Sequence, residues 1–154
     1  MRTAIVGVGN SLMKDDGVGV HAIRALQDEV LPEGTELIDA GTDPDVAFDL
    51  DDFDRIVLID AAYGGERPGT VYRFPADTPL DEQGSRRRAC HDVGLLETLQ
   101  RIARKSADVI VFGVEPSEID WGLDLSSPVR KALPGLVEII REEVGQQVRR
   151  SRCS

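Results

Sequence analysis

The sequence predicts a single α/β domain of three layers, in which a mostly parallel, twisted sheet of about five strands carries helices on both faces. Short runs of β-branched residues alternate along the chain with amphipathic helical stretches, which is typical of this class. The first run, residues 3–8, is apolar without polar alternation, as expected of a strand buried on both faces. The 154 residues suit one domain. We assign residues 1–145 to it and expect residues 146–154 to form a polar, disordered tail.

The pattern of apolar residues defines the remaining elements in order. After the first strand, apolar residues recur at helical spacing from Val18 to Val30, and Pro32 and Gly34 end that helix. Further strands are expected at residues 36–39, 55–60, 70–74 and 108–114. Further helices are expected at residues 45–50, 92–104 and 126–144. The connection before residues 70–74 is too short for a helical crossover, so this strand is predicted to pair antiparallel at an edge of the sheet.

The composition excludes several classes of function. Lysine plus arginine number 18 and aspartate plus glutamate number 28, which gives a net charge of −10. With a sequence pI near 4.6, the chain has no excess positive charge for binding nucleic acid or an anionic membrane. No stretch approaches the ~18 apolar residues of a membrane span, and no signal peptide precedes the first strand. The two cysteines, Cys90 and Cys153, are interpreted as reduced thiols of a cytoplasmic protein, not as a disulfide.

Three polar side chains are predicted at the carboxyl ends of the strands, where open α/β sheets bind their ligands. Asp16 lies in the loop after the first strand, Asp60 ends the third strand, and His91 precedes the helix at residues 92–104. Each has an ordinary structural interpretation, as a helix cap, as an acceptor for loop amides and as a structural histidine, respectively. Together, two carboxylates and an imidazole favour a site for a divalent transition metal such as nickel, zinc or copper. Three protein ligands also leave coordination positions open for a substrate.

Other chemical motifs are incomplete or absent from the sequence. The first loop begins like a dinucleotide-binding turn, but Leu12 occupies the place of its third glycine and two adjacent aspartates would repel a pyrophosphate. No P-loop, Cys-x-x-Cys, His-Glu-x-x-His or nucleophile-elbow pattern occurs. Cys90, beside His91, is a candidate thiol nucleophile or soft ligand, although a bystander role carries more weight. His21 is interpreted as a solvated or partly buried helix residue.

The first loop, Gly7-Val8-Gly9-Asn10-Ser11-Leu12 followed by Asp15-Asp16-Gly17-Val18-Gly19, resembles the opening of the maturation endopeptidases of nickel–iron hydrogenases. The resemblance continues in order through short blocks and covers nearly the whole chain. These blocks are Asp39-Ala40-Gly41-Thr42, Leu58-Ile59-Asp60-Ala61, Pro68-Gly69-Thr70, His91-Asp92-Val93-Gly94-Leu95, Gly113-Val114-Glu115-Pro116, Gly122-Leu123 and Ser126-Ser127-Pro128-Val129. Ala40 stands where the family's Asp-Gly-Gly-Thr loop has its first glycine, which leaves the metal site untouched.

The resemblance implies an enzyme that removes the C-terminal peptide of a hydrogenase large-subunit precursor after nickel has been inserted. It also implies that Asp16, Asp60 and His91 contact the metal and carry the catalysis, as in an aspartyl-type endopeptidase. Nickel is then presented by the precursor, and no organic cofactor is expected. The implied partner is the precursor, processed in the cytoplasm by a monomeric enzyme.

Three functions remain open on the sequence. A nickel-dependent endopeptidase is the leading interpretation. A maturation chaperone that inspects nickel without cutting is the second, and a small-molecule hydrolase on the same fold is the third. In the endopeptidase interpretation, nickel is either catalytic, by polarising the scissile carbonyl or activating water, or only a recognition signal. Asp16 and Asp60 are both candidates for the general base.

Overall fold

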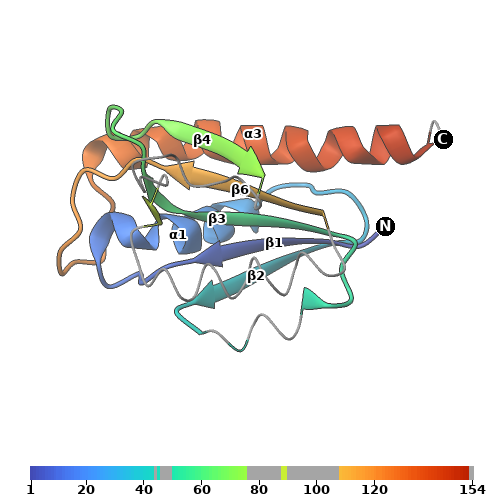
Figure 1. Cartoon of the computed structure of the whole chain (residues 1–154), viewed down its shortest axis with the longest axis horizontal. Helices are drawn as coiled ribbons and strands as arrows, with labels where there is room; N and C mark the ends of the chain where they lie inside the picture. The colour runs from blue at the N-terminus through green and yellow to red at the C-terminus, as the bar shows by residue number, and fades with distance from the viewer. Residues whose placement is uncertain (44, 46–49, 76–87, 90–107, 153–154) are drawn as a thin grey trace, which may run out of the picture.

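The computed structural model describes residues 1–43, 45, 50–75, 88–89 and 108–152, and its central feature is a mostly parallel sheet (Figure 1). Its strand order is β2-β1-β3-β6-β4. The bounds are β2 Thr35–Gly41, β1 Thr3–Val8, β3 Arg55–Tyr63, β6 Asp108–Val114 and β4 Val71–Pro75. β1 pairs in parallel with β2 and β3, β3 pairs in parallel with β6, and β4 lies antiparallel beside β6. The predicted α/β class and antiparallel edge strand are therefore confirmed.

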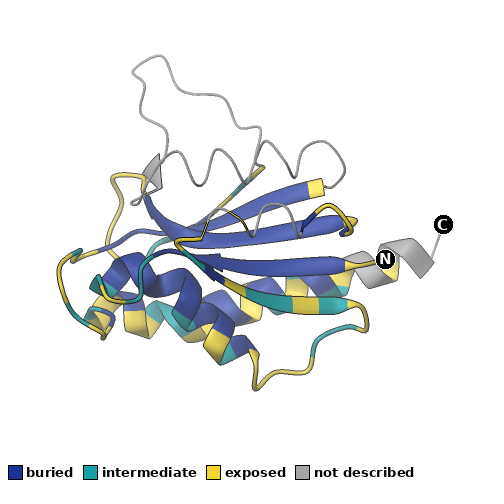
Figure 2. Cartoon of the chain, turned by 90° about the horizontal axis from the view of Figure 1, so that it is seen from below, coloured by how far each residue is buried: buried dark blue, intermediate teal, exposed yellow. Residues whose placement is uncertain are grey.

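Both faces of the sheet are buried, because its central strands carry apolar side chains on both sides. One face packs against α1 (Val18–Leu26) and α3 (Ser127–Arg152), which Figure 2 shows together on that face. The buried residues of this face include Ile5, Val57, Ile59 and Phe112. The opposite face holds a second buried cluster, which includes Val6, Ile56, Leu58 and Val111. No helix in the described part of the chain combines the length and apolar character needed to cross a membrane.

The chain order creates a switch point between β1 and β3. From β1 the chain passes through η1 (Lys14–Gly17) and α1 to β2 on one side, and it then enters β3 on the other side of β1. α/β proteins bind ligands at the carboxyl ends of the strands at such a point. The loop with Asp16 follows β1, and Asp60 lies in β3. Both predicted carboxylates therefore belong to the switch point.

In the first half of the chain, the ends of β3 and α1 differ most from the prediction. β3 continues past Asp60, because its last residues pair antiparallel with β5 (Arg88–Ala89), so Asp60 lies inside the strand and not at its end. α1 ends at Leu26, because the amides of the following residues 28 and 29 donate to carbonyls only three residues back. Val30 is consequently 87% exposed and does not belong to the helix. The helix predicted at residues 92–104 and most of that at residues 45–50 lie outside the described residues.

The final helix is longer than predicted. α3 continues to Arg152, whereas the sequence pattern ends it near residue 144 and assigns residues 146–154 to a disordered tail. Residues 146–152 are glutamine, valine, arginine and serine, with no proline among them. These residues have moderate to high helix propensity, so nothing in this stretch stops the helix. Residues 146–152 therefore belong to α3.

An ion-pair network at the amino end of β3 joins the sheet to α3. Arg55, which begins β3, is only 3% exposed, and its guanidinium donates to Glu143 of α3. Arg73 of β4 donates to the same carboxylate through Nε at 3.1 Å and Nη2 at 2.7 Å. The hydrogen bond from Arg73 is the main reason that the pKa of Glu143 lies below its usual value, and the charge of Arg55 adds to it. Because a buried charge is costly without a partner, Glu143 fixes α3 to two strands.

Glu143→Gln should lower the free energy of unfolding at neutral pH by about 3 kcal/mol, because it leaves the buried Arg55 without its counter-charge. Since the pKa of folded Glu143 is lowered, its stabilising contribution is present above the unfolded value of 4.5 and is lost as the pH falls through the lower folded value. Urea unfolding from neutral to acid pH measures both effects. Glu142→Gln, at an exposed α3 position, is the matched control. Equal unfolding midpoints for the two variants at neutral pH would contradict this role of Glu143.

Candidate active site

Asp16 lies in η1, the short 3-10 helix between β1 and α1, and is only 3% exposed. Its Oδ2 accepts a hydrogen bond from the backbone N–H of Asn10 at 2.9 Å. The interpretation of Asp16 as a helix cap is wrong, because in the described part of the chain no side-chain bond caps the start of η1 or of α1. The bond from Asn10 instead fastens the carboxylate to the loop that follows β1.

Asp60 lies within β3 and is 1% exposed. Its Oδ1 accepts a hydrogen bond at 2.8 Å from the N–H of the next residue, Ala61. β3 pairs with β1 as far as Ile59, and with β6 through Asp60 and Ala61. The sheet therefore holds the Asp60 carboxylate in a fixed position beside the end of β1.

Gly9 allows the segments that carry the two aspartates to come together. It has a φ of +129°, a conformation that favours glycine. A Cβ at this position would lie 2.0 Å from the carbonyl oxygen of Asp16 and 3.6 Å from Oδ1 of Asp60. Any side chain at position 9 would force η1 away from the residue that follows β1. The missing side chain therefore lets the backbone of Asp16 and the carboxylate of Asp60 both lie close to Gly9.

The third predicted member of the site, His91, lies outside the described residues, and so does Cys90. Within the described residues, no group of three His, Cys, Asp or Glu residues is arranged to hold a metal ion. The complete set of Asp16, Asp60 and His91 therefore stays a prediction. His21, predicted as a solvated or partly buried helix residue, is half-buried in α1, and burial is the main reason that its pKa is lowered.

Asp15 has a role different from that of Asp16, and the sequence did not reveal it. Asp15 is fully buried and accepts four hydrogen bonds from the segment between β6 and α3. The donors are the N–H groups of Ser117 (2.9 Å), Glu118 (2.9 Å) and Ser126 (2.7 Å) and the hydroxyl of Ser126 (2.7 Å). Asp15 thereby ties η1 to the residue that precedes α3. These partners lie 102 to 111 residues further along the chain, so no local pattern indicates them.

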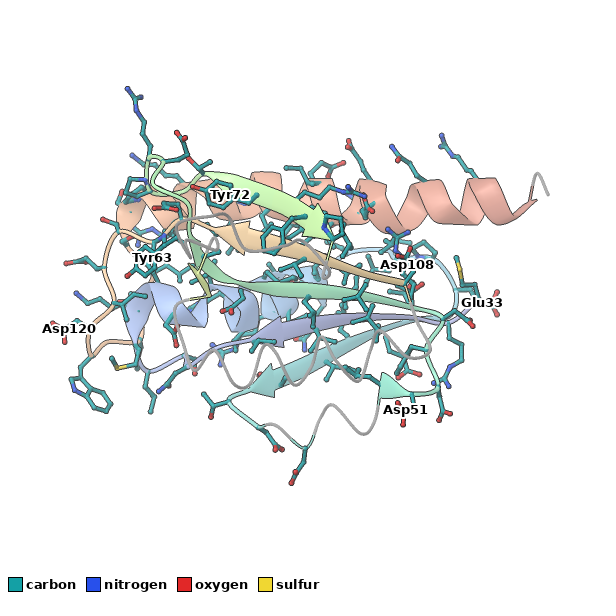
Figure 3. The ribbon with its side chains drawn as sticks, viewed as in Figure 1. Glu33, Asp51, Tyr63, Tyr72, Asp108 and Asp120 are labelled. Atoms are coloured by element: carbon teal, nitrogen blue, oxygen red, sulfur yellow. The ribbon has the colours of Figure 1, made fainter. Side chains whose placement is uncertain are left out.

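Another buried carboxylate, that of Glu115, joins the ends of β3, β4 and β6. Its Oε2 accepts hydrogen bonds from the N–H of Gly64 at 2.6 Å and from the hydroxyl of Tyr72 at 2.8 Å. Burial, together with this hydrogen bond, raises the pKa of Tyr72 to about 12. The phenol therefore stays protonated and keeps donating at neutral pH. Figure 3 shows Tyr72 and Tyr63 toward the end of the molecule opposite Asp108.

Known proteins are similar in sequence to this chain. The family described as hydrogenase maturation protease matches residues 20–143. The chain belongs to this family. The delta subunit of coenzyme F420 hydrogenase from Methanothermobacter thermautotrophicus is similar, with 33% identity covering 92% of this chain and 93% of that protein. The hydrogenase expression/formation protein HupD from Rhizobium leguminosarum is 29% identical, covering 89% of this chain and 71% of its own length.

Solved structures of family members share the fold. The NiFe hydrogenase maturation protease HybD from Thermococcus kodakarensis has a TM-score of 0.78 and 30% identity, covering 94% of this chain and 99% of that chain. The hydrogenase maturating endopeptidase HybD from E. coli has a TM-score of 0.77 at 21% identity, covering 96% of this chain and 94% of that chain. The family and the fold predicted from the sequence are confirmed. This member of the hydrogenase maturation protease family is therefore a protease.

The carboxylates of Asp16 and Asp60 are suited to two chemical roles in a protease. An ionised carboxylate is an acceptor only, and its oxygens bind divalent cations. The same group accepts a proton from an attacking water molecule. Asp16 and Asp60, held by a loop amide and by a paired strand respectively, are therefore suited to contact a metal and to act as a base.

Asp15→Asn should lower the free energy of unfolding by about 3 kcal/mol, because the amide nitrogen faces N–H donors and leaves some of them unsatisfied. It should also loosen the segment between β6 and α3. Trp121, the only tryptophan, lies in that segment and reports its motion. Time-resolved fluorescence anisotropy should therefore decay faster in Asp15→Asn than in Asp28→Asn, a change at an exposed aspartate. The same decay and the same stability in both variants would show that Asp15 is not the anchor.

Proposed function

We propose that this protease removes the C-terminal extension of a nickel–iron hydrogenase large-subunit precursor after nickel has been inserted. The observation that supports the proposal is that the backbone of Asp16 and the carboxylate of Asp60 both lie next to Gly9, at the switch point between β1 and β3. Membership of the hydrogenase maturation protease family supports the class of substrate. The resemblance in the first loop assigns these two carboxylates to the metal, with His91 as the third ligand.

In this proposal, nickel comes with the precursor as part of the substrate, and the enzyme needs no organic cofactor. Asp16, Asp60 and His91 contact the metal, and three protein ligands leave coordination positions for the precursor's own donors. A precursor without nickel lacks this contact and docks poorly. Nickel thus signals that the hydrogenase metal centre has been loaded. We propose that the enzyme works as a monomer in the cytoplasm.

Hydrolysis in this site requires a water molecule activated next to the scissile peptide bond. As the water oxygen bonds to the carbonyl carbon, a carboxylate of Asp16 or Asp60 accepts the proton. The proton then passes to the amine that leaves when the C–N bond breaks. Nickel held at the same point would polarise the carbonyl. Asp60 lies within a paired strand, whereas Asp16 lies in the short 3-10 helix η1 outside the sheet, so we expect the two positions to differ in their tolerance of substitution.

Asp60→Asn should slow processing of nickel-loaded precursor by about 100-fold or more, because it removes a charge that the sheet holds in place. Asp16→Glu should keep partial activity, since it retains a carboxylate at a position outside the sheet, whereas Asp16→Ala, which removes the carboxylate, should be inactive. His91→Ala should abolish processing. Mass spectrometry of the precursor measures the loss of the extension, and circular dichroism checks the fold of each variant.

Asp51→Asn is the control for these variants. Asp51 is exposed and lies at the end of the molecule opposite Asp120 (Figure 3). Its substitution removes one negative charge, as Asp60→Asn does. A precursor that wild-type enzyme binds but does not shorten would favour the chaperone that inspects nickel without cutting. Processing by Asp60→Asn as fast as by Asp51→Asn would contradict the assignment of the site.

A further inference from the structure

Three exposed apolar side chains gather next to the loop that carries Asp16. Leu12 is 50% exposed, Trp121 is 74% exposed and Leu123 is 67% exposed. Isolated apolar side chains are normal on a protein surface, but a cluster that includes an exposed tryptophan is typical of an interaction site. We name these three residues the Leu12–Trp121–Leu123 patch.

Backbone hydrogen bonds hold the two segments of the patch side by side. The N–H of Gly122 donates to the carbonyl oxygen of Leu12 at 2.9 Å, and the N–H of Lys14 donates to the carbonyl oxygen of Gly122 at 2.9 Å. Met13 and Gly122 form a parallel β-bridge between these segments. Asp15 fixes the start and the end of the same β6–α3 segment. The patch is therefore organised before any partner binds, which lowers the entropic cost of docking.

The charge around the patch is negative. Asp120 and Asp124 flank Trp121 and Leu123 and are exposed. Lys14 pairs with Glu118 at 3.3 Å, so its positive charge is balanced locally. The chain as a whole carries a net charge of −10. A complementary partner surface therefore combines apolar side chains with lysine or arginine.

Hydrogen bonds within one loop connect the patch to Asp16, one of the two proposed catalytic carboxylates. The N–H of Leu12 donates to Oδ1 of Asn10 at 3.0 Å, and the N–H of Asn10 donates to Oδ2 of Asp16 at 2.9 Å. The loop that contributes Leu12 to the patch therefore also positions Asp16. A chain docked on the patch lies beside the site without having to cross the sheet.

We propose that the Leu12–Trp121–Leu123 patch docks an apolar, basic surface segment of the hydrogenase precursor. The inference rests on the proposed function and adds the surface by which the substrate is recognised. Docking on the patch holds the precursor while its C-terminal end reaches the carboxylates. The patch acts on binding and takes no part in the chemical step.

The apolar contribution is tested with a Trp121→Ala/Leu123→Ala double variant and nickel-loaded precursor. We expect KM to rise at least about 10-fold, as for truncation of an interface hot spot, with kcat within about twofold of wild type because the chemical step is untouched. The matched control is Val30→Ala/Ile139→Ala, which truncates two exposed apolar residues outside the patch. An unchanged KM in the patch variant, or an equal rise in the control, would overturn the proposal.

The contribution of the negative charge beside the patch is tested with an Asp120→Lys/Asp124→Lys double variant. The control is Asp28→Lys/Asp51→Lys, which changes the net charge by the same amount. The first pair should raise KM and weaken its dependence on salt, while the second pair should leave both near wild type.

A wild-type dimer that Trp121→Ala/Leu123→Ala dissociates would assign the patch to self-association and overturn the proposal. Failure of wild-type enzyme to shorten the precursor would overturn the proposed function, and the docking proposal with it. Cleavage with a KM insensitive to the patch would overturn the docking proposal alone.

Discussion

A single buried carboxylate, that of Asp15, determines how the functional end of this protein is assembled. Burying a charge is costly unless its hydrogen-bonding capacity is filled. Asp15 meets that requirement with donors from Ser117, Glu118 and Ser126. These donors converge on one side chain only when the segment between β6 and α3 folds against η1. Asp16 and the Leu12–Trp121–Leu123 patch consequently share one rigid support.

Close contacts between backbone atoms then fix the position of η1 and α1 on the sheet. At the start of α1, a Cβ on Gly19 would lie 2.3 Å from the carbonyl oxygen of Ile59, and a Cβ on Gly9 would lie 2.0 Å from that of Asp16. The two glycines let η1 and α1 rest directly on β3, one residue from Asp60. The backbone of Asp16 and the carboxylate of Asp60 both lie next to Gly9, and we propose that the two carboxylates contact a divalent cation delivered by the substrate. The proposed response of this protease to a metal rests on the same arrangement.

Much of the fold could be predicted because it depends on local patterns. β1 and β6 are buried on both faces, so their unbroken apolar runs gave their limits. The antiparallel direction of β4 could be predicted because the connection before this strand is too short for a helical crossover. The end of β3 was missed, because its last residues pair with a distant segment, and so was the end of α1. Asp16 and Asp60 were predicted as site residues from the loop after the first strand and from the expected end of the third, and this assignment stays a prediction. The structural role of Asp15 could not be predicted, because its hydrogen-bond partners are distant in the sequence and follow no periodic pattern.

The pair of Asp16 and Asp60 is proposed to act on nickel that the precursor carries. The most direct measurement compares two preparations of precursor, one made with nickel and one without, each mixed with metal-free enzyme. We expect cleavage of the nickel-loaded precursor alone, and no cleavage of the other when nickel is added only to the enzyme before mixing. Equal cleavage of the two preparations would contradict the requirement for nickel in the precursor, even if Asp16 and Asp60 both prove essential.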